Sequence, residues 1–285
     1  MTQLSLITVD EPTQPEGIDL RCCSVEELLG DMPGEPALIV ADPPWGYSQA
    51  PGVASPDLQY STVTDAQIAR WIDAAWDASP NARLALWCTW PKLGEWWTAA
   101  QAQGLRWEYK SGGSWHKIPA AGVGYHWLGN SELILLYTKG SPGCKWGSLS
   151  NAHTSQRQRH SEKPVGWMAE WLERWTEPGD LVLDLFAGLG PMARACARSG
   201  RRYVGAELDP ERYRQAVDRL ALDRSTQPQG AQLTVEERIE EAVREARPHV
   251  YRQQHHGRHE QDRADAVDWL HKWVGQTHAG VSDER

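Results

Sequence analysis

A short apolar run that ends at two prolines is the feature that most constrains the fold of this chain. Residues 37–40 read Ala-Leu-Ile-Val, and Ala41, an acid and two prolines follow. A continuous apolar run of this kind predicts a strand buried on both faces, as in a parallel sheet. Proline lacks an N–H, fixes φ and restrains the residue before it, so the strand has to stop there. We therefore expect an open α/β sheet with a stiff turn at the carboxyl edge of one strand, where such sheets bind ligands.

The turn itself carries a distinctive set of groups. Asp42, Pro43, Pro44 and Trp45 supply one carboxylate, backbone carbonyls and a flat indole. This set suits a planar ring with an exocyclic amine, because the carboxylate and a proline carbonyl can accept the amine hydrogens while an indole stacks on the ring. For four residues alone, a Pro-Pro turn beside a packing Trp is a competing interpretation. The 16 Trp and single Phe of the chain mean that most Trp side chains must be core.

A second motif lies in the C-terminal half. The buried strand expected at 181–185 runs into Asp184-Leu-Phe-Ala-Gly-Leu-Gly190, and a helix then begins at Pro191. Glycines at 188 and 190 allow a tight turn and close approach of a ligand. Glu207, at the end of the next strand, can accept both hydroxyls of a ribose. The glycine spacing differs from that of dinucleotide sites and no phosphate-binding lysine follows, so a ligand with a ribose and a cationic sulfonium fits better.

These motifs carry a family resemblance. Asp42-Pro-Pro-Trp45 resembles the catalytic motif of S-adenosylmethionine-dependent amino-methyltransferases that act on adenine N6, whereas the related cytosine N4 enzymes more often begin it with Ser. The glycine motif and Ser161-Glu-Lys-Pro164 are similar to the segments of that family that bind S-adenosylmethionine. The resemblance implies catalytic roles for Asp42, Pro43, Pro44 and Trp45. It implies a cofactor site formed by Lys163, Pro164, Asp184, Phe186, Ala187, Gly188, Gly190, Glu207 and Asp42.

The order of the two motifs indicates the topology. The catalytic motif precedes the cofactor motif, which resembles the circularly permuted, β-type arrangement of the family. The implied fold is α/β, a doubly wound Rossmann-like methyltransferase sheet that is mostly parallel, with an antiparallel strand within residues 107–138. We expect a flexible N-terminal arm at 1–17, a methyltransferase domain at 18–222 and a polar helical C-terminal extension at 223–285.

Charge bears on the substrate. The net charge of −9 argues against a generic nucleic-acid binder, but residues 139–163 hold five basic residues and one acid. We interpret 140–162 as an exposed loop that either contacts phosphates, with Arg157, Arg159 and His160 as candidates, or is a solvated connector. Lys117 lies in a Trp-x-Lys segment that resembles the same family, and Tyr47 is a second candidate to stack on the base.

Several other classes of function are disfavoured. The five Cys form no metal-spaced cluster, and the His residues near 255–259 lack a ligand pattern, so we expect no metal site. We find no signal peptide and no apolar run long enough to span a bilayer, and expect a soluble, cytoplasmic protein with no membrane partner. The C-terminal extension could mediate homodimerisation, DNA contact or nothing.

The residues and the resemblance together predict methyl transfer from S-adenosylmethionine to N6 of adenine in DNA, after the base is flipped out of the helix. Three alternatives remain open from the sequence. They are an RNA adenosine N6-methyltransferase, a DNA cytosine N4-methyltransferase, and a catalytically silent nucleic-acid-binding partner.

Overall fold

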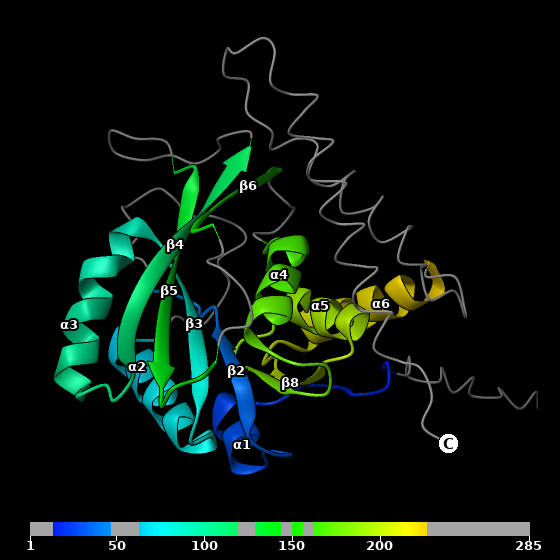
Figure 1. Ribbon diagram of the computed structural model, residues 1–285, viewed down its shortest axis with the longest axis horizontal. Helices are drawn as coiled ribbons and strands as arrows, with labels where there is room; N and C mark the ends of the chain where they lie inside the picture. The colour runs from blue at the N-terminus through cyan, green and yellow to red at the C-terminus, as the bar shows by residue number, and fades with distance from the viewer. Residues whose placement is uncertain (1–13, 47–62, 119–128, 144–149, 157–161, 227–285) are drawn as a thin grey trace, which may run out of the picture. The chain divides into compact units, whose positions relative to one another are not determined.

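The computed structural model describes residues 14–46, 63–118, 129–143, 150–156 and 162–226. These residues form one eight-stranded sheet with helices on both faces (Figure 1). The strands in chain order are β1 (Ile18–Arg21), β2 (Pro36–Ala41), β3 (Ala82–Cys88), β4 (Glu108–Ile118), β5 (Ser131–Lys139), β6 (Ala152–Gln156), β7 (Leu181–Asp184) and β8 (Arg202–Ala206). The helices are α1 (Val25–Gly30), α2 (Asp65–Ala74), α3 (Leu93–Gln103), α4 (Val165–Trp175), α5 (Pro191–Ser199) and α6 (Pro210–Thr226), with short 3₁₀ turns η1 (Ala75–Ala78) and η2 (Trp90–Lys92).

The sheet order is β1-β8-β7-β2-β3-β5-β4-β6. Strand β5 runs antiparallel to both of its neighbours, and all other pairs are parallel. The predicted doubly wound, mostly parallel sheet with an antiparallel strand in the 107–138 region is therefore confirmed. The chain leaves β7 toward β8 on one side and leaves β2 toward β3 on the other, so the boundary between β7 and β2 is the topological switch point of the sheet.

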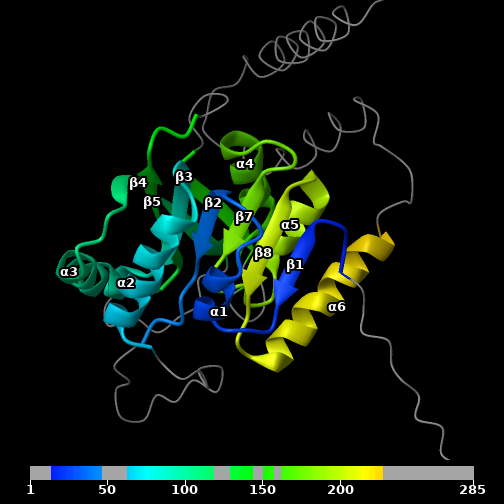
Figure 2. The ribbon, with the colours of Figure 1, turned by 90° about the horizontal axis from the view of Figure 1, so that it is seen from below.

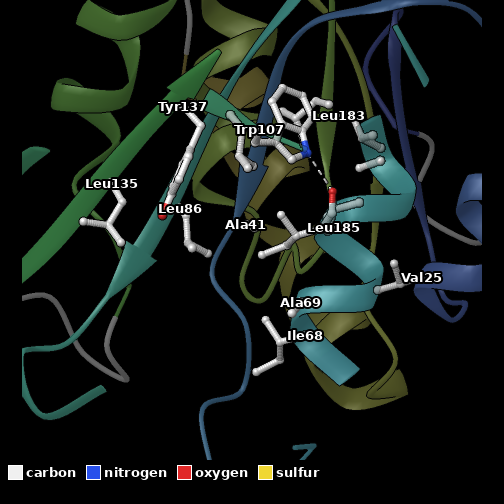
Figure 3. Close-up of a cluster of buried hydrophobic side chains, with 14 of the residues drawn as sticks. Val25, Ala41, Ile68, Ala69, Leu86, Trp107, Leu135, Tyr137, Leu183 and Leu185 are labelled. Carbon is white, nitrogen blue, oxygen red and sulfur yellow. Dashed lines mark hydrogen bonds between the residues drawn. The ribbon is translucent and has the colours of Figure 1, made fainter. Parts of the chain in front are cut away.

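Two apolar layers flank the sheet, and Figure 2 shows α1, α2 and α3 on one face with α4 and α5 on the other. Local sequence signals begin and end these helices. Ser24 and Glu27 form the predicted capping box of α1, and Gly104 ends α3 in the left-handed conformation. Figure 3 shows part of the core under α2, where the indole N–H of Trp107 donates to the carbonyl of Ile72 at 2.9 Å.

The segment interpreted as a loop at 140–162 contains strand β6, which corrects that prediction. Its sequence, Ala-His-Thr-Ser-Gln, has no hydrophobic alternation, because β6 is a sheet edge whose side chains are exposed or half-buried. Strand β4 also runs through Gly112 and Gly113 without a break. A Cβ at Gly113 would come within 3.0 Å of the Asn151 carbonyl oxygen, so this glycine lets the chain before β6 approach β4 closely.

Candidate active site

The two sequence motifs meet at the switch point of the sheet. Val40 of β2 and Asp184 of β7 are paired in register, so Asp42 and the glycine turn follow neighbouring strands at one edge. A pocket at this edge brings together six of the residues predicted from sequence. They are Asp42, Lys163, Asp184, Phe186, Ala187 and Gly188. Carboxyl edges beside a switch point are the usual ligand sites of such sheets.

Asp42 ends a chain of alternating charges. The Lys163 ammonium lies 2.7 Å from Asp42 Oδ2 and 3.0 Å from Glu132 Oε2. The other oxygen of Glu132 pairs with the ammonium of Lys117. Indoles cover both cations, because Lys163 Nζ lies 5.0 Å from the Trp87 ring centroid and Lys117 Nζ lies 4.9 Å from that of Trp115. Each buried charge therefore faces an opposite one, which offsets the cost of removing it from water.

The ionisation of these groups follows from their surroundings. The Asp42 side chain is 36 % exposed through the pocket, but protein encloses its other sides. This burial raises the pKa of Asp42, and Lys163 opposes the rise. Burial alone would raise the pKa of Glu132 too, but Lys163 and Lys117 outweigh it and the pKa falls. Burial would lower the pKa of Lys163, whereas Asp42 and Glu132 raise it, so the ammonium stays charged.

The Pro-Pro turn differs in two ways from the expected platform. The Pro43 carbonyl accepts a hydrogen bond from the Trp45 N–H at 2.8 Å, which leaves it one free lone pair. The indole of Trp45 is only 6 % exposed and donates to the Trp87 carbonyl at 3.1 Å. It packs edge-on against Trp96 in the core, so in this conformation it presents no open face to a base. The predicted stacking of Trp45 on the base stays a prediction, and Tyr47, the second candidate, lies outside the described residues.

The glycine turn after β7 has the predicted backbone. Gly188 and Gly190 adopt φ of 56° and 73°, in the left-handed region that favours glycine. At Gly190 a Cβ would also lie 3.3 Å from the Cβ of Ala216 in α6. Pro191 then begins α5, as its fixed φ and missing N–H allow. The left-handed backbone thus requires glycine at both positions, the packing against α6 does so at Gly190, and Gly188 lines the pocket.

Two carboxylates accept hydrogen bonds from the backbone of this turn. Glu207 accepts the N–H groups of Gly188 and Asp209, both at 2.8 Å. Asp184 accepts the N–H of Phe186 and the hydroxyl of Tyr203, both at 3.2 Å. Burial raises the pKa of Glu207 despite its hydrogen bonds, and it raises the pKa of the 3 % exposed Asp184 to about 7.

Ion pairs of the preceding residue fix the segment that contains Lys163 and Pro164. Glu162, which lines the pocket, pairs with Arg194 of α5 at 2.8 Å and with Arg219 of α6 at 2.6 Å. Pro164 is the N-cap residue of α4. These contacts tie the segment before α4 to both helices that follow the glycine turn, so Lys163 is held against Asp42 by neighbours on two sides.

Sequence reasoning missed part of the site. No role in the site was predicted for Glu132 or Trp87, although both contact Lys163 and Trp87 lines the pocket. The contacts of Glu132 with Lys117 and Lys163 can be inferred only when the strand order is known. Arg157 and Arg159 lie outside the described residues. Within the described ranges, no cluster of three or more His, Cys, Asp or Glu side chains is arranged to hold a metal ion. Over those same ranges, no helix is both long and apolar enough to cross a bilayer.

A sheet of this order, with its single antiparallel strand and a glycine turn at the switch point, has the Rossmann-like methyltransferase fold. Comparison with solved structures agrees. The M1.HpyAVI complex with S-adenosylmethionine superposes with a TM-score of 0.55 at 19 % identity, over 71 % of this chain and 98 % of that one. The cytosine-N4-specific PvuII DNA methyltransferase gives 0.54 at 12 % identity, over 82 % and 94 %.

Sequence comparison adds a family match. Residues 91–218, less than half of the chain, match a family model described as DNA methylase. This stretch includes the glycine turn and Glu207 but begins after Asp42. The methylase YubD of Escherichia coli (strain K12) is 35 % identical over 116 residues, 39 % of this chain and 49 % of that protein. The type II methyltransferase M.XycI of Xanthomonas campestris pv. cyanopsidis is 53 % identical over 45 residues, 16 % of this chain and 15 % of that protein. The chain thus spans at most about half the length of these relatives.

Proposed function

We propose that this protein transfers a methyl group from S-adenosylmethionine to the exocyclic amine of a DNA base, with adenine N6 as the acceptor. The observation that carries the proposal is the meeting of Asp42 and the Asp184–Gly190 turn in one pocket. One motif suits an amine acceptor and the other suits a nucleoside-containing methyl donor. The match of residues 91–218 to a DNA methylase family supports the same conclusion.

The residues around the glycine turn fit the cofactor. Glu207 uses two of about four lone-pair sites for backbone N–H groups, so it can still accept ribose hydroxyls. Gly188 would bring backbone close to the ligand, while Asp184, when ionised, and Lys163 would provide charge of both signs for the ammonium and carboxylate of a methionine moiety. The M1.HpyAVI structure with a similar fold is a complex with S-adenosylmethionine. This cofactor would supply an electrophilic methyl group on a sulfonium.

Asp42 and Pro43 would prepare the acceptor. The lone pair of an aromatic exocyclic amine is delocalised into the ring, so the nitrogen is a weak nucleophile. Hydrogen bonds from its N–H groups to the Asp42 carboxylate and the Pro43 carbonyl would draw it toward tetrahedral geometry. Its lone pair would then point toward the methyl group that bound S-adenosylmethionine would supply, and the nitrogen would afterwards release its extra proton to water. Positioning and electrostatic stabilisation account for most of the rate, so no strong base is needed.

Adenine is proposed because Asp42 begins the motif, which resembles the adenine N6 enzymes. Cytosine N4 is the second candidate, since it presents a chemically similar amine and the cytosine-N4-specific PvuII enzyme covers 82 % of this chain. In a duplex either base has to be flipped out before its amine reaches Asp42. Tyr47, Lys117, Arg157 and Arg159 are proposed to contact the substrate.

The test is a transfer assay with labelled S-adenosylmethionine on duplex DNA, single-stranded DNA and RNA, followed by mass spectrometry of the digested nucleosides. We expect N6-methyladenine from DNA. Detection of N4-methylcytosine would mean that the acceptor is cytosine N4 rather than adenine N6. A product from RNA alone would mean that the substrate is RNA rather than DNA. Absence of any product with intact cofactor binding, measured by calorimetry, would instead indicate a catalytically silent binding protein.

A further inference from the structure

Trp90 differs from most of the tryptophans that the structure describes. Trp45, Trp87, Trp96 and Trp115 are each at most 6 % exposed, whereas Trp90 is 58 % exposed. It begins η2, two residues after the carboxyl end of β3. An exposed Trp needs no explanation by itself. Its fixed position at the edge of the sheet that also carries Asp42 is what makes it informative.

The local structure holds this indole in place. Its Nε1–H donates to Ser131 Oγ at 3.0 Å, across to the first residue of β5. Behind it, the N–H groups of Lys92 and Leu93 both donate to the Thr89 carbonyl, and the buried Lys92 ammonium lies 3.3 Å from Asp65. A side chain already fixed in one orientation loses little entropy when a ligand covers it.

Its position is set by the sheet. β3 runs parallel to β2, with Ala41 paired to Leu86, so Trp90 follows its strand at the same edge as Asp42 follows β2. Ser131, which anchors the indole, directly precedes Glu132, and one ammonium joins Glu132 to Asp42. Consecutive side chains of a strand point to opposite faces, so the Ser131 anchor holds Trp90 at the same edge of the sheet as Asp42 but on the face opposite to the charge chain. The Trp45 indole, in contrast, is packed in the core.

We propose that Trp90 is a stacking platform for a nucleobase of the substrate that has left the helix stack beside Asp42. This inference rests on the proposed function and adds a substrate-contacting residue to it. Every base has a π face, and a fixed indole can stack on any of them without a hydrogen-bond code. Flipping exposes both faces of the target base, and a platform at this edge can cover one of them.

The experiment compares Trp90→Leu, Trp90→Phe and the control Trp97→Leu. Leu keeps apolar bulk without a π face, whereas Phe keeps a ring without the Ser131 anchor. Trp97 is also exposed, at 37 %, but contacts Tyr137, six residues along β5 from Ser131 and about 20 Å away. Binding of an end-labelled DNA duplex is measured by fluorescence anisotropy with S-adenosylhomocysteine present, with cofactor affinity by calorimetry and thermal unfolding as checks on the fold.

We expect Trp90→Leu to weaken DNA binding about 10-fold and Trp90→Phe to weaken it about 3-fold or less, as stacking energies suggest. Trp97→Leu should bind DNA like the wild type, and cofactor affinity should be unchanged in all three variants. Equal DNA binding by Trp90→Leu and Trp97→Leu, with the wild type active on DNA, would overturn the role of Trp90 alone. A wild type that methylates no nucleic acid would overturn the proposed function, and this inference with it.

Discussion

Asp42 and Asp184 follow neighbouring strands at one edge of the sheet, yet the protein holds the two carboxylates by different means. Asp42 is partly open to the pocket, and its partner is an ammonium at the end of a long side chain. Asp184 is buried, and its partners are a backbone N–H and the hydroxyl of Tyr203. Glu207 is likewise held by backbone N–H groups.

The difference separates two roles. A carboxylate paired with a lysine can share that cation with a second carboxylate, as Asp42 shares Lys163 with Glu132, and so keep an oxygen available to a substrate. A carboxylate bound to backbone N–H groups cannot change partner without moving the chain, so it shapes a binding turn. We therefore call the Asp42 side of the pocket the acceptor half. The donor half is Asp184 and the glycine turn, together with Glu207, which lies behind the turn and accepts the N–H of Gly188. We expect a substitution in one half to change the function of that half and to leave the function of the other half unchanged.

The largest effect is expected in the acceptor half. Asp42→Ala should lower kcat for methyl transfer at least about 100-fold, because it removes the oxygen assigned to the target amine. Cofactor affinity, measured by calorimetry, should change little. Lys163 keeps Glu132 as a partner, so the variant should remain folded in thermal unfolding. A folded Asp42→Ala protein with near-wild-type kcat would remove Asp42 from catalysis.

The second effect should be confined to the donor half. Glu207→Ala should weaken cofactor binding by about 1–3 kcal/mol, because charge-assisted hydrogen bonds are removed and the N–H of Gly188 is left without its acceptor. At saturating cofactor, kcat should stay close to wild type. Glu211→Ala is the matched control, since this exposed acid lies four residues further along, in the first turn of α6. Unchanged affinity in Glu207→Ala would contradict the ribose role.

The sequence predicts those parts of the structure whose signals lie within a few neighbouring residues, and it does not predict contacts between residues that are far apart in the chain. Strands β2 and β7 and the glycine turn were predicted because an apolar run and the prolines or glycines that end it lie within a few residues. The Lys163–Glu132 contact joins residues from separate strands and loops, and its geometry follows only from the sheet order. Likewise, the burial of Trp45 involves contacts that are distant in sequence, since its indole donates to a carbonyl 42 residues away. β6 is a polar edge strand, so no hydrophobic period marks it.

The third prediction concerns pH and the donor half. Because burial raises the pKa of Asp184 to about 7, above its ordinary value of about 3.9, the folded state binds more protons than the unfolded state between those values. The free energy of unfolding should therefore fall as pH rises through this window, by up to about 1.4 kcal/mol per pH unit from this group, and level off above it. Asp184→Asn should lack this component.

Urea unfolding of the cofactor-free protein from pH 5 to pH 8 tests the prediction. Other carboxyls titrate in the same range, so the informative quantity is the difference in unfolding free energy between wild type and Asp184→Asn at each pH. We expect the variant to gain relative stability up to about pH 7 and to run parallel above it. Profiles that are parallel throughout would mean that Asp184 ionises normally in the folded protein.

The smallest effect is expected at the outer border of the acceptor half. β6 is parallel to β4 and therefore to β2, so it ends at Gln156 on the same edge as Asp42. Ser155 is paired with Lys117 of the charge chain. Arg157 and Arg159 follow directly in sequence, within the segment of net positive charge. A duplex substrate needs its phosphates neutralised near the reacting base, so these two residues are proposed to contact phosphates.

Replacing Arg157 and Arg159 together with Ala should weaken DNA binding by a similar factor for every base sequence. The slope of log affinity against log salt should flatten by about 0.9 for each phosphate that the variant no longer neutralises, because each neutralised phosphate releases condensed counterions. Cofactor affinity and kcat at saturating DNA should stay near wild type. Arg70 and Arg214, both exposed and on helices α2 and α6, are the matched pair for a control double variant. If both double variants keep the wild-type salt slope, the segment after β6 is a solvated connector, and the DNA phosphates are neutralised elsewhere, with the C-terminal extension the next segment to truncate.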